Sequence, residues 1–364
     1  MTTILKVPQR RRPQFHPIPV HAVDRLTDDA VAVTFLVPEE LRALYSFRPG
    51  QHLTVRLMVD GEDVRRSYSL SSTPADLERD GILRVGVKQV PGGAFSTYAN
   101  AELTVGQTLD VMPPIGHFTT NFTTERSQHY VAIVAGSGIT PVLSLLATGL
   151  ATEPESRWTV FYGNRYVRSV MFLEELSDLK DRYPTRLQLV HVLSREPQDA
   201  ELLSGRIDAE RLPRLLQAFA PKADEYFLCG PYGLVMAAEE LLGDADVPVH
   251  SELFFADETP VADAVSAVDA DTHEAEVSII LDGRTSVFGM RRDERVLDAA
   301  LRVRGELPYA CKGGVCSTCK AKVVSGEVRM ARNYALEPDE LAAGYVLTCQ
   351  SSPVTDQVVV DYDA

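Results

Sequence analysis

The sequence predicts a multidomain protein of the α/β plus β class: an antiparallel β-barrel, then a doubly wound parallel sheet, then a small domain of sheet and helix. Two changes of pattern along the 364 residues support this division. Short alternating strands give way to continuous apolar strands separated by helices, and an acidic, Ala-rich stretch comes before the last part of the chain. A chain of this length also exceeds what one ordinary core accommodates.

The barrel is predicted for residues 14–122. Short runs in which apolar residues alternate with polar ones occur at residues 31–36, 53–57 and 83–87, and Gly and Pro residues mark turns between them. Many short strands with few helical windows are typical of a small antiparallel barrel.

The parallel-sheet domain is predicted for residues 123–255. Residues 130–135 form a continuous apolar run that leads through glycines into a helical window. Further buried-type strands are expected at residues 158–162, 187–192 and 225–229. Apolar strands that alternate with helices indicate a parallel, doubly wound sheet.

The acidic stretch, residues 256–272, is predicted to be a linker because it has no basic residue and little that it can bury. The last domain is predicted for residues 273–364. Its first apolar run and the run at 286–288 flank an Asp282-Gly283 turn, which is typical of a β-hairpin. A short helix is expected at residues 293–301.

The composition excludes several classes of function. A net charge of −15 argues against nucleic acid as a partner, and no apolar run is long enough to span a membrane. The arginines at 10–12 are followed by prolines instead of an apolar stretch, so no secretory signal is expected. Four of the five cysteines lie close to the C-terminal end, unlike a secreted disulfide framework. We therefore expect a cytoplasmic, metal-binding protein.

The strongest motif is the C-x4-C-x2-C spacing of Cys311, Cys316 and Cys319, with Cys349 further along the chain. This spacing is typical of plant-type two-iron, two-sulfur clusters, which are held by four thiolates. Glycines inside the loop allow backbone amides to approach the inorganic sulfides. The alternative is a structural zinc site, which more often uses paired C-x2-C elements.

Two elements of the barrel predict a flavin site. Arg66 offers a fork of donors for a pyrophosphate, Tyr68 a flat ring, and Ser69 a hydroxyl for the reactive ring nitrogen. A Gly-rich turn then leads into a helix whose free amides suit a second phosphate, which favours FAD over a mononucleotide. The alternatives are an ordinary surface strand and turn glycines with a structural role only. The expected contacts are Arg66, Tyr68, Ser69, Leu70, Val87, Lys88, Gly93, Ala94, Phe95 and Ser96.

The parallel-sheet domain predicts a nicotinamide nucleotide site. Glycines directly after its first strand permit a tight turn and close approach of a nucleotide, although the full G-x-G-x-x-G pattern is absent. Arg165 and Arg195 follow the next two strands without a ribose-binding carboxylate, which favours a 2′-phosphate and hence NADPH. The alternative is that both arginines are merely solvated. The expected contacts are Gly136, Gly138, Thr140, Pro141, Asn164, Arg165, Ser194, Arg195, Gly230, Pro231 and Phe254.

Three residues are candidates for a catalytic role: Ser69, Cys229 and Glu252. Cys229 ends a strand at the edge of the sheet where such folds bind ligands, so it lies either near the nicotinamide or in the core. Glu252 either tunes the flavin and relays a proton, or is a structural carboxylate. Phe254 is placed to cover a flavin face.

These motif sets, in this order, resemble the ferredoxin–NADP⁺ reductase superfamily with a plant-type ferredoxin fused at the C-terminal end. Within this superfamily the chain resembles the reductase subunits of bacterial phenylacetyl-CoA epoxidases, through residues 47–53, 162–165, 307–316, 336–347 and 358–361. The resemblance implies an FAD-binding barrel, an NADP-binding domain and a β-grasp ferredoxin domain. It also implies a cytoplasmic oxidoreductase that feeds electrons to a diiron oxygenase.

Three cofactors fit one electron path. NADPH gives two electrons as a hydride and an iron–sulfur cluster takes one, so a flavin must stand between them. The alternatives are the reductase of another ring-hydroxylating or steroid oxygenase, and a ferredoxin-type carrier without catalysis. Basic residues close to the cysteines, among them Lys312 and Lys320, predict a surface that docks on the oxygenase.

Overall fold

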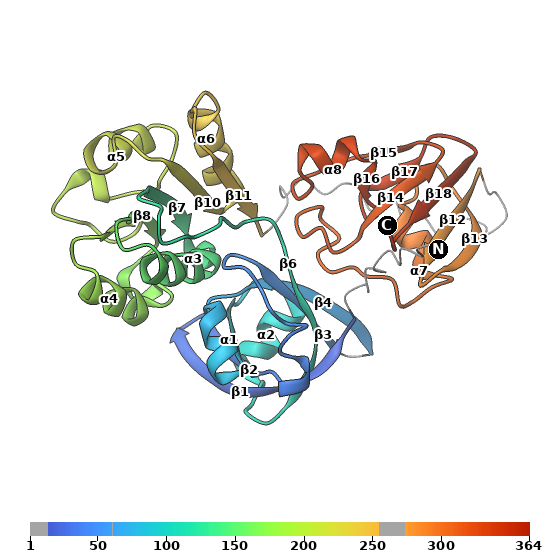
Figure 1. Ribbon diagram of the computed structural model, residues 1–364, viewed down its shortest axis with the longest axis horizontal. Helices are drawn as coiled ribbons and strands as arrows, with labels where there is room; N and C mark the ends of the chain where they lie inside the picture. The colour runs from blue at the N-terminus through green and yellow to red at the C-terminus, as the bar shows by residue number, and fades with distance from the viewer. Residues whose placement is uncertain (1–13, 60, 255–273) are drawn as a thin grey trace, which may run out of the picture. The chain divides into compact units, whose positions relative to one another are not determined.

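The computed structural model describes residues 14–59, 61–254 and 274–364, which form a front unit that begins at Phe15 and a separate C-terminal unit (Figure 1). Each of the three main sheets lies inside one of the predicted domain ranges. The predicted linker, 256–272, lies outside the described residues, and the exact domain bounds stay predictions. No helix in the described part of the chain is long and apolar enough to cross a membrane.

The first half of the front unit is the predicted antiparallel barrel. Its strands are β1 (His16–Thr27), β2 (Ala30–Leu36), β3 (His52–Val59), β4 (Glu62–Ser69), β5 (Ile82–Lys88) and β6 (Thr108–Ile115), in the order β4-β3-β6-β1-β2-β5. A bridge between Leu70 and Val85 brings the two ends of this order together. Helices α1 (Pro74–Asp80) and α2 (Ala94–Ala101) lie in the connections around β5.

Alternate residues of β2 face two different hydrophobic cores. Val31, Val33 and Val85 are buried in the barrel core, whereas Ala30 and Ala32, which alternate with the first two, belong to the core of the next domain. Successive side chains of a strand point to opposite faces, so one face of β2 fills the barrel and the other receives the nucleotide domain.

The second half of the front unit is a parallel sheet of five strands in the order β11-β10-β7-β8-β9. These strands are β7 (His129–Ala135), β8 (Arg157–Asn164), β9 (Leu187–Leu193), β10 (Glu225–Gly230) and β11 (Val249–Leu253), and the helices between them are α3 (Ile139–Thr152), α4 (Leu173–Arg182), α5 (Arg211–Phe219) and α6 (Tyr232–Leu242). The chain leaves β7 toward β8 but leaves β10 toward β11, so the strand order reverses between β7 and β10. Ligands bind at such a switch point, outside the carboxyl ends of the strands.

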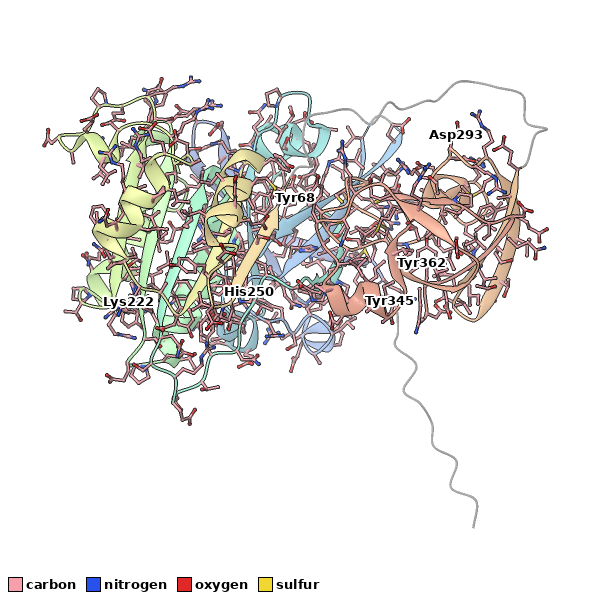
Figure 2. The ribbon with its side chains drawn as sticks, turned by 90° about the horizontal axis from the view of Figure 1, so that it is seen from above. Tyr68, Lys222, His250, Asp293, Tyr345 and Tyr362 are labelled. Atoms are coloured by element: carbon pink, nitrogen blue, oxygen red, sulfur yellow. The ribbon has the colours of Figure 1, made fainter. Side chains whose placement is uncertain are left out.

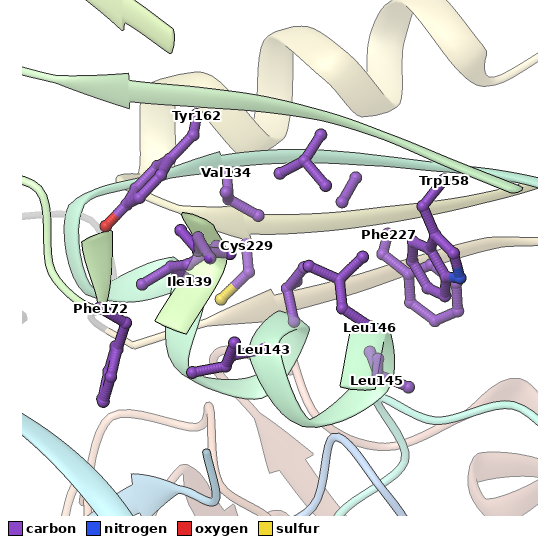
Figure 3. Packing of buried hydrophobic residues seen from close by; sticks show 14 of the residues in the cluster. Val134, Ile139, Leu143, Leu145, Leu146, Trp158, Tyr162, Phe172, Phe227 and Cys229 are labelled. Carbon is purple, nitrogen blue, oxygen red and sulfur yellow. The ribbon is translucent and has the colours of Figure 1, made fainter. Parts of the chain in front are cut away.

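The core of this domain lies between the sheet and α3. Trp158 and Phe227 stack at 5.5 Å between ring centroids, and Leu145 and Leu146 pack beside them (Figure 3). All four side chains are almost completely buried. The burial of this apolar surface explains why a helix with so few polar residues is stable in this position.

Buried acids lie at the amino ends of the strands, opposite the switch point. The Glu153 carboxylate is completely buried and accepts hydrogen bonds from the hydroxyl groups of Tyr130 and Ser156, at 2.9 and 2.6 Å. The backbone N–H of Thr123, in the connection from the barrel, donates to the same carboxylate at 3.1 Å. These bonds fasten that connection to the sheet.

Glu225, at the start of β10, is the second buried acid. Arg126 donates to one of its oxygens at 2.8 Å, and His250 Nε2 lies 2.8 Å from the other oxygen. Figure 2 labels His250, which lies on β11. Burial alone would raise the pKa of Glu225, but hydrogen bonds from His250, Thr120 and Arg126 outweigh it and hold the pKa below its ordinary value.

The C-terminal unit is a mixed sheet in the order β13-β12-β18-β14-β16, with a separate pair β15-β17. Its strands are β12 (Ala275–Leu281), β13 (Arg284–Met290), β14 (Lys320–Ser325), β15 (Val328–Met330), β16 (Tyr345–Leu347), β17 (Ser351–Pro353) and β18 (Gln357–Asp361), and its helices are α7 (Val296–Leu301) and α8 (Pro338–Ala342). The predicted hairpin at Asp282 and Gly283 is confirmed, because both residues have positive φ, as a two-residue turn between β12 and β13 requires. The last strand, β18, is the central one of the sheet.

We expect Glu225→Gln to lower the unfolding free energy of the front unit by about 2 kcal/mol near pH 7, somewhat less than the roughly 3–5 kcal/mol of a fully buried pair, because Arg126 is partly exposed. Since folding lowers the pKa of Glu225, the wild-type advantage is complete above the unfolded pKa of about 4.3 and disappears as the pH falls through the folded value. Urea unfolding between pH 7 and pH 3 measures this difference.

The control is Glu240→Gln, on the exposed side of α6, which we expect to unfold like the wild type at every pH. A difference between wild type and Glu225→Gln that is as large at pH 3 as at pH 7 would contradict the assignment.

Candidate functional site

The four predicted cluster cysteines meet in the C-terminal unit as two pairs. The Cys311 thiol lies within hydrogen-bonding reach of Cys316, and the Cys319 thiol within reach of Cys349. Contact with its partner and then burial raise the pKa of Cys319, whereas the same contact lowers the pKa of Cys349. Cys311 is half-buried and the other three are buried.

This paired arrangement fits two iron atoms that are each held by two thiolates. Among the described residues, no three side chains of the ligating types converge on one point that would hold a single ion. A structural zinc site would need four ligands around one point.

Polar groups of the loop point at the sulfur atoms. The N–H of Gly313 donates to Cys311 Sγ at 3.3 Å, and the hydroxyl of Thr318 donates to Cys316 Sγ at 3.2 Å. Gly314 has φ of +81°, and a Cβ there would come within 3.1 Å of the Gln350 side chain, so the tight loop depends on this glycine. Donors of this kind stabilise thiolate charge and tune an iron–sulfur centre.

A buried chain of hydrogen bonds supports the cysteine loop from the C-terminal end. Tyr362, directly after β18, donates to the Thr348 hydroxyl at 2.9 Å, and Thr348 donates to the Cys319 carbonyl at 2.9 Å. Burial raises the pKa of Tyr362, so the phenol stays protonated and remains a donor. Tyr362 lies inside the C-terminal unit (Figure 2), and Thr348 precedes Cys349, so this chain connects two cluster ligands.

The basic residues near the cysteines are partly neutralised. Lys312 Nζ lies 2.9 Å from Asp298, and Lys320 Nζ lies 2.7 Å from Glu340. The prediction that these lysines form a basic docking surface stays a prediction, and the ion pairs reduce the charge that they offer to a partner.

The predicted flavin residues lie at the end of β4 and the start of α2. Arg66 is exposed, and its guanidinium donates to the Arg65 carbonyl at 2.7 Å. The ring of Tyr68 lies 5.4 Å from that of Phe95, on α2. Helix α2 begins after Gly93 without any side-chain cap, so its first amides are open to an anion. An arginine fork on β4 and an uncapped helix start, on two segments that meet through Tyr68 and Phe95, fit the pyrophosphate of FAD.

The side chains of several other residues that we expected at the flavin make contacts within the barrel domain instead. The side chains of Leu70, Val87 and Phe95 belong to its core, so only their backbone groups can face a cofactor. Lys88 forms an ion pair with Asp29 at 3.5 Å. The Ser96 hydroxyl donates to the Gly93 carbonyl at 3.2 Å, across Ala94, and thereby fixes the turn that opens α2.

Ser69 and Glu252 are brought together from the two halves of the front unit. The Ser69 hydroxyl donates to Glu252 Oε2 at 2.9 Å, and His52 Nδ1 lies 3.6 Å from Glu252 Oε1. Ser69 and His52 face each other across β4 and β3, whereas Glu252 lies near the end of β11. All three side chains are nearly buried.

The expected nucleotide turn lies at the switch point. Residues Gly136–Gly138 form a short turn before α3, and a Cβ at Gly138 would approach the Cys229 carbonyl to 2.2 Å, so only glycine permits this contact. The Thr140 hydroxyl donates to the Ser137 carbonyl at 2.8 Å and holds the turn against α3, whose next residue is the buried Pro141. Gly230 follows Cys229 with φ of +158°, and Pro231 precedes α6.

Cys229 itself is completely buried. Its sulfur packs among the apolar residues under the sheet, near Ile139 and Leu143 (Figure 3). Burial, and then the nearby Glu252, raise the pKa of this thiol, so it is not a nucleophile. Its place near a nicotinamide stays a prediction. Phe254 is partly buried and packs against the same core.

The two arginines expected at a 2′-phosphate lie on adjacent segments. The N–H of Arg195 donates to the Arg165 carbonyl at 2.9 Å, and the N–H of Ser194 donates to the Asn164 carbonyl at 2.8 Å. Both arginine side chains are exposed, and neither guanidinium forms an ion pair within the described part of the chain. They therefore offer two neighbouring positive charges at the carboxyl edge of the sheet.

Known proteins match the chain over three consecutive segments. Family models for an oxidoreductase FAD-binding domain, an oxidoreductase NAD-binding domain and a 2Fe-2S iron-sulfur cluster binding domain match residues 17–120, 132–240 and 279–354. A component of the 1,2-phenylacetyl-CoA epoxidase of Escherichia coli K12 is 48% identical, over 96% of this chain and 98% of its own length.

The ferredoxin reductase component of a 3-ketosteroid-9-alpha-monooxygenase from Rhodococcus rhodochrous is 35% identical over the whole of both chains. The solved structure of phthalate dioxygenase reductase has a TM-score of 0.57 with 20% identity, over 95% of this chain and 98% of its own, and shows the same fold.

The chain belongs to the ferredoxin–NADP⁺ reductase superfamily, in the group with a C-terminal 2Fe-2S domain. The predicted fold class, oxidoreductase activity and binding of FAD, a nicotinamide nucleotide and a 2Fe-2S cluster are confirmed. The alternative of a ferredoxin-type carrier without catalysis is excluded, because this reductase carries its own FAD- and NAD-binding domains.

Some residues of the reductase site gave no signal in the sequence. Thr348 and Tyr362 belong to no recognised motif, and His52 lies in a segment that carries the family resemblance but had no predicted role. Each reaches the site through contacts between residues far apart in the chain. The position of Tyr362 close to an alternating apolar strand is typical of a core residue. Its hydroxyl bond to Thr348 depends on the register of β18, which the sequence alone does not define.

We expect Tyr362→Phe to keep the cluster of the reductase but to weaken its attachment, because Thr348 loses a buried hydrogen-bond donor that contributes about 1 kcal/mol. The visible absorbance of the holoprotein in increasing urea reports cluster loss, and its midpoint should fall. Tyr345→Phe is the control, since this half-buried hydroxyl has no hydrogen bond among the described residues. Equal midpoints for wild type and Tyr362→Phe would rule out the supporting role.

Proposed function

We propose that this reductase takes electrons from NADPH and supplies them to the diiron oxygenase of a phenylacetyl-CoA epoxidase system in the cytoplasm. The observation that carries the proposal is the 48% identity to an epoxidase component across nearly the full length of both chains. The steroid monooxygenase component is less similar, at 35%. The three sites of the chain fit the electron path that such a system needs.

Bound FAD supplies the step from a two-electron hydride donor to a one-electron acceptor, and the 2Fe-2S cluster supplies the one-electron output. The chain holds and orients these groups. Arg66 and the uncapped start of α2 would bind the FAD pyrophosphate, and the four cysteines would bind the two irons.

Ser69 and Glu252 are proposed to act at the flavin ring. Because the Ser69 hydroxyl donates a hydrogen bond to Glu252, its lone pairs would be free to accept a hydrogen bond from the N–H that the reduced flavin carries at its reactive nitrogen. Glu252, held near His52, would then exchange a proton with that hydroxyl. Cys229, at the end of β10, is proposed to lie beside the nicotinamide as a small, uncharged residue, although its side chain is buried in this structure.

The preference for NADPH is proposed from Arg165 and Arg195. Two exposed guanidinium groups on backbone-bonded neighbouring segments match a phosphate dianion, which accepts charge-assisted hydrogen bonds from both. NADH lacks this phosphate, so the two guanidinium groups would not strengthen its binding.

We expect Arg165→Ala combined with Arg195→Ala to raise the KM for NADPH by about 10²-fold, since each hydrogen bond to a charged group contributes about 1.5–3 kcal/mol. The KM for NADH should change by less than a factor of about 3, because exposed charges without a partner contribute little. Steady-state reduction of a one-electron dye gives both values, and Arg168→Ala, on the same exposed loop, is a comparison variant. Equal effects on both nucleotides would refute the 2′-phosphate assignment.

The partner is tested by reconstitution. The reductase, NADPH and purified epoxidase oxygenase subunits should convert phenylacetyl-CoA to its epoxide with about one NADPH consumed per product. Reduction of flavin and cluster by NADPH without turnover of the epoxidase would contradict the partner and leave the reductase activity intact. Turnover with ketosteroid oxygenase subunits instead would favour the steroid alternative.

A further inference from the structure

The barrel and the nucleotide domain meet at Gly86, in the middle of β5. Gly86 is buried and pairs with Ala32 on β2, while its neighbours Val85 and Val87 point into the barrel core. Because side chains alternate along a strand, Gly86 lies on the outer face of the barrel, where Ala32 already contacts the nucleotide domain.

The nucleotide domain fills the space above Gly86. A Cβ at this position would lie 2.6 Å from Thr140 Cγ2, 2.9 Å from Met171 Cε and 2.9 Å from Phe172 Cε2. Each distance is well below van der Waals contact, so any residue larger than glycine must displace one of these groups.

Two of the three groups cannot move easily. Thr140 is β-branched, and its hydroxyl is bound to Ser137, which fixes the direction of its methyl group. Phe172 is completely buried in a left-handed backbone conformation, with φ of 57°, and its ring points away from the sheet (Figure 3). Only the flexible end of Met171 can give way.

Two polar contacts near Gly86 join the barrel to the nucleotide domain. The buried Ser144 hydroxyl, on α3, donates to the Ser72 carbonyl of the barrel at 2.6 Å. On β5, the Arg84 guanidinium pairs with Glu175 at 2.8 Å and lies 5.1 Å from the Phe172 ring. Both contacts oppose a sideways movement of the two domains that would relieve a clash at Gly86.

We propose that Gly86 is a positioning residue that sets the separation between the flavin barrel and the nucleotide turn. Thr140 lies in the first turn of α3 and is bound to the Gly136–Gly138 turn, so a push on its methyl group moves the turn that would hold the nucleotide. Hydride transfer needs the reacting atoms about 3–3.5 Å apart, and a misplacement of about 1 Å can cost about 10²-fold in rate. The inference rests on hydride transfer from the nucleotide to FAD in this unit.

The test is Gly86→Ala in the full-length holoprotein. We expect anaerobic stopped-flow reduction of the flavin at saturating NADPH to slow by at least about tenfold. FAD content and the Kd of NADP⁺ should change by less than about a factor of 3, because the added methyl group points away from the barrel interior and does not meet the two arginines. An unchanged rate of flavin reduction would overturn the proposal.

A second variant relieves the clash. Thr140→Ser removes the methyl group that a Cβ at Gly86 would meet first and keeps the hydroxyl bound to Ser137. We expect Gly86→Ala to slow flavin reduction less in the Thr140→Ser background than in the wild type, although the contact with Phe172 remains. Failure of this rescue would overturn the proposal. The control is Gly305→Ala, an exposed glycine of the C-terminal unit whose added methyl group meets no atom within 4 Å.

A third variant applies if Gly86→Ala does not retain FAD. Ser144→Ala removes the hydrogen bond to the Ser72 carbonyl in the same interface without adding volume. It should slow flavin reduction several-fold while NADP⁺ affinity is kept, and a wild-type rate would overturn the proposal. If wild-type flavin is not reduced by NADPH at all, the proposed function fails instead, and this separates the two failures.

Discussion

The hydrogen bond between Ser69 and Glu252 joins the end of a barrel strand to the end of a strand in the nucleotide domain. Ser144 with Ser72 and Arg84 with Glu175 make further polar contacts between the same two domains. A buried polar group without its partner costs more than the bond itself contributes, so such contacts define one relative position instead of a range. An interface held by apolar packing alone would tolerate small sliding movements, which hydride transfer does not tolerate.

In the C-terminal unit, residues of the unit itself support the cysteine loop that would hold the cluster. All four cysteines, the donors to their sulfur atoms and the chain from Tyr362 through Thr348 lie within this unit. Its central strand β18 is the last one in the chain, so the cysteine loop is supported only when the C-terminal residues are in place. The contacts that support the cluster site in the described residues therefore come from the C-terminal unit itself.

The sequence predicted those features that depend on local spacing. The Cys311, Cys316, Cys319 loop is one short segment, and the Asp282-Gly283 turn needs only two neighbouring residues with positive φ. Features that depend on packing between domains were not predictable. Gly86 has no motif, and its importance arises because Thr140 and Phe172 lie above it. Lys312 and Lys320 suggested a basic surface, but helices brought Asp298 and Glu340 beside them.

Strand β11 runs from the amino ends of the sheet strands, where the buried acids lie, to their carboxyl ends at the switch point. It is an edge strand with β10 as its one neighbour, so its backbone is held on one side only. Its side chains make further contacts. His250 pairs with Glu225 and stacks on Phe227 at 4.9 Å between ring centroids, and Glu252 accepts a hydrogen bond from the Ser69 hydroxyl. Residues 250 and 252 are two apart and share one face of the strand. The buried acid at the amino ends of the strands therefore helps to hold the strand whose Glu252 carboxylate contacts the barrel at Ser69, so both ends of this short strand are anchored by side-chain contacts.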